Sequence, residues 1–419
     1  MKRLLSVCLS LCIMVSVFVS FDITASAKTN LKKTTVSASN ISNGINVSWK
    51  KVSGAKSYKL YRKASGAKKY SVVKKTNSKT VKYLDKKVSA GKTYSYQVVA
   101  VKGKDYSKSK TKSITRLLAP KNVKVQSYVK NNYYVDKSYI DIDSAKLFVD
   151  DPGEPDNNVM GVKITWTKSK GANKYDIYRK IVGGKFEKIK TTGNTSAYVD
   201  EDIYYIDDDS YKVKKCYYKV VARRSKSTSS SSTVRKITYI DPMKVSAESY
   251  ASGMFLGWGY SVNECIDGYK IYRSTNGKNG KYSLIAKLSK NTSEFTDKNV
   301  EFNKTYYYKI VAYKGSLNSV AIITKTQYKP MKTVNVSVGA TDDSVKKSFE
   351  KAIKRSDLGD TTVDDLKPYL RFTSLNKKIA TISRDFVVTG VSKGQVKANF
   401  DLLLDDKSYE AGFILINVN

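Results

Sequence analysis

The sequence predicts an all-β protein built from tandem antiparallel β-sandwiches, and three observations support this prediction. Apolar residues alternate with polar ones along many short segments, one such pattern occurs three times, and Gly- or Asn-containing turns separate the segments. A period of two is what a half-buried strand requires. At 419 residues the chain is long enough for about two to four domains, and the repeats favour four.

The repeated pattern first covers residues 45–62 and returns at residues 162–179 and 254–273. Each copy places apolar residues two apart and ends that run in Trp, continues through a Gly-containing turn, and closes on Tyr-x-hydrophobic-Tyr-Arg. These features predict two antiparallel strands whose aromatic side chains enter a core. The expected structural core residues are Trp49, Trp166, Trp258, Tyr58, Tyr175, Tyr269, Tyr94 and Tyr306.

A later strand of each repeat shows the same alternation. Tyr94, Tyr96, Val98 and Ala100 are spaced two apart, so they share the predicted core face. The second copy has Cys216 at the position of Tyr94. On the opposite face of the preceding strand, Tyr61, Tyr178 and Tyr272 are expected to be at least partly exposed.

The N-terminus has the pattern of a secretory signal peptide over residues 1–27. Met-Lys-Arg precedes an apolar run over residues 4–21, and Ala-Ser-Ala follows at residues 25–27. No later segment is long and apolar enough to span a bilayer as a helix. We therefore expect a secreted, extracellular protein that is associated with the cell surface and has no transmembrane segment.

Prolines indicate the domain boundaries. Pro120, Pro242 and Pro330 each stand just before the first predicted strand of a domain, where a missing N–H is tolerated. The expected domains are residues 28–118, residues 119–240 with an acidic insertion at about 130–160, residues 241–329 and residues 330–419.

The first three domains resemble bacterial fibronectin type III repeats. The resemblance is carried by the Trp of strand B, the Tyr of strand C, and the Gly/Asn-Lys-Thr-Tyr sequence that opens strand F. It implies an immunoglobulin-like sandwich of seven antiparallel strands, with Tyr94 and Tyr306 in the place of the tyrosine corner. In the second repeat Cys216 holds that place, so either Tyr217 or packing alone must satisfy the corner.

The last domain has a different pattern. Residues 334–338 predict a strand, and residues 342–355 predict an amphipathic helix with Val345, Phe349, Ala352 and Ile353 on its apolar face. From residue 372 onward the sequence resembles the group 2 bacterial immunoglobulin-like family. This resemblance implies a fourth sandwich, carrying a short helix.

The composition argues against an enzyme. The chain contains no His, which excludes Ser-His-Asp and Cys-His catalytic arrangements and His-ligated zinc. No Gly-rich phosphate loop precedes a helix. Cys216 and Cys265 are too few for a metal cluster, and whether they pair stays open. We expect no catalytic activity, no cofactor and no metal site.

The acidic segments leave two interpretations open. The insertion at about 130–160 offers oxygen ligands that suit calcium, but it lacks the twelve-residue spacing of a calcium-binding loop. A solvated acidic loop is therefore favoured over a calcium site, and the same holds for residues 207–209.

The charge is concentrated in the first domain. Lys and Arg number 76 against 37 Asp and Glu, a net charge of +39, and residues 28–118 alone hold 24 basic and 2 acidic residues. Lysines attract polyanions as point charges without reading their shape, so no specific nucleic-acid recognition is expected. The candidate polyanion-binding residues are the adjacent pairs Lys50, Lys51, Lys68, Lys69, Lys74, Lys75, Lys86 and Lys87.

These features favour a non-catalytic binding or adhesion protein of the bacterial cell surface. Its expected partners are anionic cell-wall polymers or glycans and, secondarily, other surface proteins. Two alternatives stay open: a structural spacer or protein–protein interaction rod, and an accessory carbohydrate-binding protein of a separate glycosidase.

Overall fold

The computed structural model describes residues 31–130, 133–135, 159–203, 214–242, 245–258, 266–353, 361–404 and 407–419. The expected signal peptide, most of the acidic insertion, residues 207–209 and Cys265 lie outside these residues. The chain divides into two compact units, one ending at Arg116 and the other beginning at Leu117.

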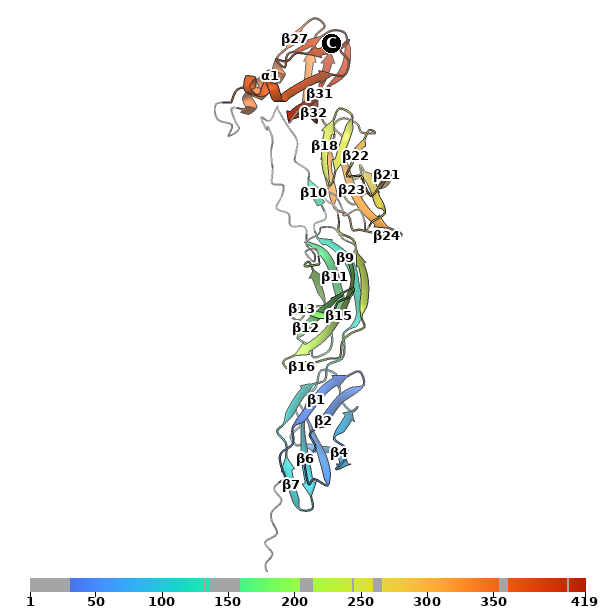
Figure 1. Cartoon of the computed structure of the whole chain (residues 1–419), viewed down its shortest axis with the longest axis vertical. Helices are drawn as coiled ribbons and strands as arrows, with labels where there is room; N and C mark the ends of the chain where they lie inside the picture. Colours follow the sequence, from blue (N-terminus) through green and yellow to red (C-terminus); the bar gives the residue numbers. More distant parts are fainter. Residues whose placement is uncertain are drawn as a thin grey trace, which may run out of the picture. The chain divides into compact units, whose positions relative to one another are not determined.

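The first unit is a sandwich of two antiparallel sheets (Figure 1). One sheet has the order β1-β2-β5, and the other has the order β4-β3-β6-β7 with β8 also paired to β6. The strands are β1 (Val36–Ile41), β2 (Gly44–Trp49), β3 (Ser57–Ala64), β4 (Ser71–Asn77), β5 (Lys82–Asp85), β6 (Thr93–Lys102), β7 (Asp105–Lys108) and β8 (Lys112–Thr115).

The second unit begins with two further sandwiches of the same sheet plan. One contains the sheet β14-β11-β9 and the sheet β13-β12-β15-β16, with β17 beside β15. Its strands are β9 (Lys121–Lys130), β11 (Val159–Thr167), β12 (Lys174–Ile181), β13 (Glu187–Thr192), β14 (Ala197–Asp200), β15 (Lys214–Arg224), β16 (Ser227–Thr228) and β17 (Arg235–Tyr239).

The next sandwich contains the sheet β18-β19-β22 and the sheet β25-β23-β20-β21, with β24 beside β23. Its strands are β18 (Ser246–Tyr250), β19 (Gly253–Gly257), β20 (Gly268–Ser274), β21 (Ser283–Ser289), β22 (Glu294–Asp297), β23 (Thr305–Lys314), β24 (Leu317–Asn318) and β25 (Ile323–Gln327). β10 (Tyr133–Val135), from the acidic insertion, adds a parallel strand to β25. This stretch of the insertion therefore extends the sheet of the third sandwich.

The last domain pairs the sheet β26-β32-β31-β28 with the sheet β27-β30-β29. Its elements are β26 (Lys332–Val336), β27 (Thr341–Asp342), α1 (Ser344–Ile353), α2 (Val363–Leu366), the 3-10 turn η1 (Lys367–Tyr369), β28 (Leu370–Ser374), β29 (Ala380–Ile382), β30 (Val388–Gly390), β31 (Gly394–Leu404) and β32 (Lys407–Val418). The all-β prediction is confirmed, because antiparallel sheets make up nearly all the regular structure.

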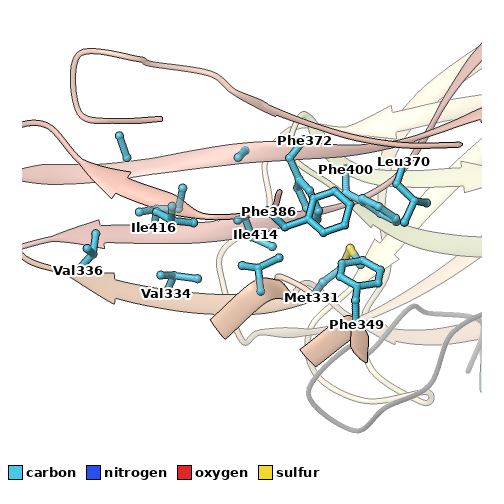
Figure 2. Packing of buried hydrophobic residues seen from close by; sticks show 14 of the residues in the cluster. Met331, Val334, Val336, Phe349, Leu370, Phe372, Phe386, Phe400, Ile414 and Ile416 are labelled. Atoms are coloured by element: carbon cyan, nitrogen blue, oxygen red, sulfur yellow. The ribbon is translucent and has the colours of Figure 1, made fainter. Parts of the chain in front are cut away.

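Helix α1 forms within the predicted range of residues 342–355. Its buried residues are the four that the spacing selects, Val345, Phe349, Ala352 and Ile353. Asp342 accepts a hydrogen bond from the backbone N–H of Ser344 at 2.8 Å, where a helix leaves donors unpaired. Figure 2 shows Phe349 in the same cluster as Phe372 of β28, Phe400 of β31, and Phe386 of the turn between β29 and β30.

The repeats bury the expected aromatic residues. Each Trp packs against the strand-C Tyr of its own repeat, with ring centroids 5.2–5.7 Å apart. The hydroxyls of Tyr58 and Tyr175 accept backbone N–H bonds from Val52 and Ser169 at 2.8 and 2.9 Å. Tyr94 and Tyr306 accept from Ser89 and Glu301, five residues upstream, both at 2.8 Å. All eight expected aromatic residues are buried.

The second repeat fills the tyrosine-corner position by packing, one of the two alternatives that the sequence left open. Cys216 is a buried free thiol whose pKa burial raises to about 11. Tyr217 points to the other face, beneath the ammonium of Lys180 at 5.0 Å. Two residues before Cys216, the buried Lys214 donates from Nζ to the carbonyl of Ile203 at 2.8 Å. Packing of Cys216 therefore fills the place of the corner tyrosine, and the lysine ammonium, which only donates, satisfies a backbone carbonyl rather than an N–H.

A cluster of a half-buried Arg, a buried Asp and a buried Tyr joins the two sheets of each repeat. Arg62 of β3 and Tyr96 of β6 both bond Asp85 of β5, at 2.9 and 2.7 Å. The same arrangement recurs as Arg179, Asp200 and Tyr218, and as Arg273, Asp297 and Tyr308. Burial, together with the bond to aspartate, raises the pKa of all three tyrosines. The cluster satisfies a carboxylate that would otherwise be costly to bury.

One residue of the last domain packs into the hydrophobic core of the third sandwich. Phe413 of β32 belongs to the core cluster of the third sandwich, where its ring centroid lies 5.6 Å from that of Tyr328 and 5.9 Å from that of Phe302. Lys397 places its Nζ within 5.2–5.5 Å of the centroids of all three rings and donates to the carbonyl of Ala251 at 2.8 Å. These contacts connect two domains that the sequence indicated as separate modules.

Candidate binding surface of the first sandwich

The eight lysines expected to bind polyanions are all exposed. Lys50 and Lys51 follow β2, Lys68 and Lys69 lie in the turn between β3 and β4, and Lys86 and Lys87 follow β5. Lys74 and Lys75 lie on β4, which is an edge strand of its sheet. The four pairs therefore lie at edges and turns, where both neighbouring side chains can stay in water. None of these eight lysines lines the groove described next.

A groove of about 490 Å³ runs over the outer face of the sheet β4-β3-β6-β7. It is lined by Lys59, Tyr61, Tyr70, Gln97, Val99, Val101, Gly103, Lys104, Tyr106 and Lys108. Of these residues, only Tyr61 was predicted from the strand alternation to face outward. Cations and aromatic rings meet here on one continuous face.

The strand register explains how these side chains come together. Val99 of β6 is paired with Lys59 of β3 on one side and with Lys108 of β7 on the other. Residues that are paired across antiparallel strands point to the same face, so an apolar floor lies between two lysines. Tyr61 is paired with Gln97, and Tyr106 with Val101, which places a ring beside the floor at each end.

The rings differ in their exposure. Tyr106 is 72% exposed, whereas Tyr61 and Tyr70 are half-buried. The amide of Gln97 donates to the hydroxyl of Thr111 at 2.8 Å, and the Tyr70 hydroxyl lies 3.4 Å from the same oxygen. Lys63 places its Nζ 5.4 Å from the centroid of the Tyr70 ring. The Gln97 end of the groove is therefore held by side-chain hydrogen bonds.

The other two repeats carry a lysine at the position of Gln97. Lys219 lies 5.3 and 4.2 Å from the ring centroids of Tyr178 and Phe186. Lys309 lies 5.1 and 4.2 Å from those of Tyr272 and Tyr282, and burial lowers its pKa. The partly exposed Tyr178 and Tyr272 are thus covered by a cation of their own sheet.

The end of this outer face at the position of Val101 is also filled in the second and third repeats. In the second, Arg223 stands at the position of Val101 and donates to the buried Asp176 at 2.9 Å. In the third, Tyr313 stands there, with the Nζ of Lys270 4.7 Å from its centroid. The first repeat has the smaller Val101 at the position of Arg223 and Tyr313, and Lys59 at the position of Asp176. The groove on the outer face of the first repeat is therefore not filled at this end.

The sequence contained a signal for this groove. Aligning the three repeats on strand F shows Ser95, Gln97 and Val101 in the first where the others have Tyr, Lys, and Arg or Tyr. Alternation identifies the core face of a strand, but it does not show which outward positions are small enough to leave a groove.

The described residues give no indication of a metal centre or a membrane span. Among them, no three His, Cys, Asp or Glu side chains are grouped as metal ligands. In the same part of the chain, no helix is both long enough and apolar enough to cross a bilayer.

The comparisons with known proteins give no family assignment. No protein-family model matches the sequence, and no curated protein matches it. Among solved structures, the FN1–FN3 domains of chicken CNTN1 match at 15% identity and a TM-score of 0.21, over 70% of this chain and 97% of theirs. A two-domain fibronectin type III segment of chicken tenascin matches at 15% identity and a TM-score of 0.21, over 40% and 91%. A Fn3-like protein from Clostridium thermocellum matches at 26% identity and a TM-score of 0.18, over 20% and 88%. At these TM-scores the likeness carries no argument about function, which has to come from the surface itself.

Proposed function

We propose that the protein is a secreted, non-catalytic binding protein that its first sandwich holds at the bacterial cell surface by attraction to anionic wall polymers or glycans. The observation that carries this proposal is the charge of residues 28–118, where 24 basic residues face only 2 acidic ones. All eight paired lysines are exposed, so their charges are available to a ligand.

The physical basis is additive attraction. Each exposed lysine near an extended anion contributes a small screened interaction, and many of them together raise the local concentration of the polymer. The last domain, with 14 basic and 12 acidic residues, has almost no such excess. The affinity should therefore belong mainly to the first sandwich and should fall as salt shortens the screening length below about 10 Å.

A pull-down on isolated bacterial cell walls tests the proposal. The purified chain without residues 1–27 is incubated with walls that retain teichoic acid and with walls from which it has been stripped. We expect retention at low salt on the intact walls, little retention on the stripped walls, and release in molar salt. Retention that stays unchanged into molar salt would contradict attraction to a polyanion.

Two specific observations favour a second function, that of a structural spacer. The packing of Phe413 into the third sandwich and the added strand β10 stiffen the connections within the second unit. A spacer needs stiffness but no ligand. If neither form of the wall retains the protein at low salt, the spacer function is favoured over the binding function.

A further inference from the structure

The outer face of the first sandwich differs from its two counterparts in a specific way. All three repeats place a pair of rings side by side: one on strand C and one just before the next strand. The pairs are Tyr61 with Tyr70, Tyr178 with Phe186, and Tyr272 with Tyr282. In the second and third repeats a lysine ammonium lies over both rings, within 4.2–5.3 Å of their centroids. A cation over an aromatic face is a favourable contact, so these two faces are satisfied internally.

The first repeat keeps the rings but has no lysine at that position, and Lys63 of β3 itself contacts only the Tyr70 ring, with its Nζ 5.4 Å from the centroid. Gln97 is neutral, and its amide is bonded to Thr111. The cations that do line this face, Lys59, Lys104 and Lys108, lie farther along it beside Val99, Val101 and Tyr106. Rings and positive charges are therefore displayed next to each other, around a floor of half-buried valines.

We propose that this groove binds an acidic sugar unit of the polymer that the first sandwich attracts, an inference that rests on the proposed function. The apolar face of a pyranose ring can stack on tyrosine, and its carboxylate or sulfate can pair with the lysines. The sugar hydroxyls have partners in the Gln97 amide and the tyrosine hydroxyls. At about 490 Å³ the groove lies within the roughly 300–1,000 Å³ of typical ligand sites.

The lining favours this occupant over two others. A polymer of phosphates without rings would use the lysines but would leave the exposed Tyr106 without a role. A single nucleic-acid strand stacks successive bases along a basic channel, whereas this groove is confined to one face of one sheet. A chain of acidic sugars uses the rings, the cations and the hydrogen-bonding groups together.

The variant Gln97→Lys in the full chain distinguishes binding in the groove from general electrostatic attraction to the first sandwich. The substitution places in the first repeat the residue that the other two carry, so its ammonium should lie over Tyr61 and Tyr70 and occupy one end of the groove. It also raises the net charge, so simple attraction predicts an equal or higher affinity for any polyanion. Ser65→Lys, in the exposed turn after β3, adds the same charge away from the groove and serves as the matched control.

Binding of a heparin hexasaccharide is measured by calorimetry, with inorganic polyphosphate and a single-stranded oligonucleotide as comparison ligands. We expect Gln97→Lys to weaken hexasaccharide binding about tenfold or more and to leave polyphosphate binding unchanged or stronger. Ser65→Lys should bind the hexasaccharide at least as tightly as the unchanged chain. Tyr106→Ala should also weaken hexasaccharide binding. Because the Tyr106 ring is 72% exposed and lies outside the core, this variant should fold, and it tests the groove even if Gln97→Lys does not fold.

Three results would overturn the groove assignment. If both Gln97→Lys and Tyr106→Ala bind the hexasaccharide as tightly as the unchanged chain, the binding comes from the overall positive charge and not from the groove. Loss of oligonucleotide binding alone in these variants would identify a nucleic-acid site instead. If the unchanged chain binds no polyanion at all, the proposed function itself fails, which is distinct from the first two results.

Discussion

Tyr96 donates its hydroxyl hydrogen to Asp85 at 2.7 Å across the two sheets of the first sandwich. Asp85 lies on β5 of one sheet and Tyr96 on β6 of the other, and Arg62 completes the cluster from β3. Because Asp85 is only 1% exposed, its charge is stabilised by these partners rather than by water. The same three residue types do this in all three repeats.

Asp85→Asn is expected to destabilise the first sandwich by about 3 to 5 kcal/mol, because it leaves the Arg62 guanidinium without its buried counter-charge. Tyr96→Phe removes one hydrogen bond and should cost less, about 1 to 3 kcal/mol. Urea unfolding of both variants would measure the difference. Equal and small effects from the two substitutions would show that the cluster does not hold the sheets together.

Trp258→Ala should cost the third sandwich about 3 to 5 kcal/mol, as other large-to-small core substitutions do. Because Phe413 of the last domain packs in the same cluster, limited proteolysis should cut within residues 241–329 and also near Phe413. The first sandwich should resist, because the described members of its cluster all lie between Leu31 and Ile114.

Trp49→Ala is the matched control for that substitution. It should expose the first sandwich alone and leave residues 241–329 uncut. Cleavage confined to the third sandwich in Trp258→Ala, with the last domain fully resistant, would mean that the packing of Phe413 contributes no coupling between the two.

Asp241, just after β17 and 3.9 Å from the ammonium of Lys214 in the second sandwich, gives this part of the chain a specific pH dependence. Burial raises its pKa from 3.8 to about 6, against the opposing effect of Lys214. Between these two values the folded chain keeps a proton that the unfolded chain has lost, so this contribution to stability is present at low pH and is lost as the pH rises through about 6. That difference in pKa corresponds to a loss of about 3 kcal/mol.

Asp241→Asn should therefore reduce the fall in stability between about pH 4 and pH 7, as measured by urea unfolding at each pH. Asp202→Asn, at an exposed acid of the second sandwich, should leave the pH profile unchanged. Parallel profiles for Asp241→Asn and the unchanged chain would show that Asp241 titrates as an ordinary surface carboxylate.

Lys397→Met tests the contact between the third sandwich and the last domain. It removes bonds from Nζ to the Ala251 carbonyl at 2.8 Å and the Tyr328 hydroxyl at 3.0 Å, while it keeps the apolar stem. Losing hydrogen bonds to a charged group costs about 1.5 to 3 kcal/mol, so amide hydrogen exchange at residues 249–251 should become about tenfold faster or more. Lys393→Met, at an exposed lysine of the same domain, should leave that exchange unaltered.

The sequence predicted the core faces well because alternation is set by strand geometry alone. Tyr94, Tyr96, Val98 and Ala100 occupy one face of β6, and all four are buried as expected. The Arg–Asp–Tyr cluster was not predicted, although its three residue types recur in every repeat, because alternation does not show which strands of opposite sheets lie close together. The groove was missed for a related reason, since it depends on which outward residues of β3, β6 and β7 are small.

The excess of basic residues in the first sandwich is the basis of the proposed polyanion binding. The most direct measurement is the salt concentration at which the full chain elutes from a heparin column. Two charge-reversal variants are compared with the unchanged chain. One replaces Lys50, Lys51, Lys68 and Lys69 by Glu in the first sandwich, and the other replaces the exposed Lys377, Lys378, Lys393 and Lys407 by Glu in the last domain. Both variants change the net charge equally, so we expect a large fall in the elution salt concentration for the first variant and a small fall for the second. Equal falls for the two would mean that net charge alone governs binding, and would contradict the assignment of polyanion binding to the first sandwich.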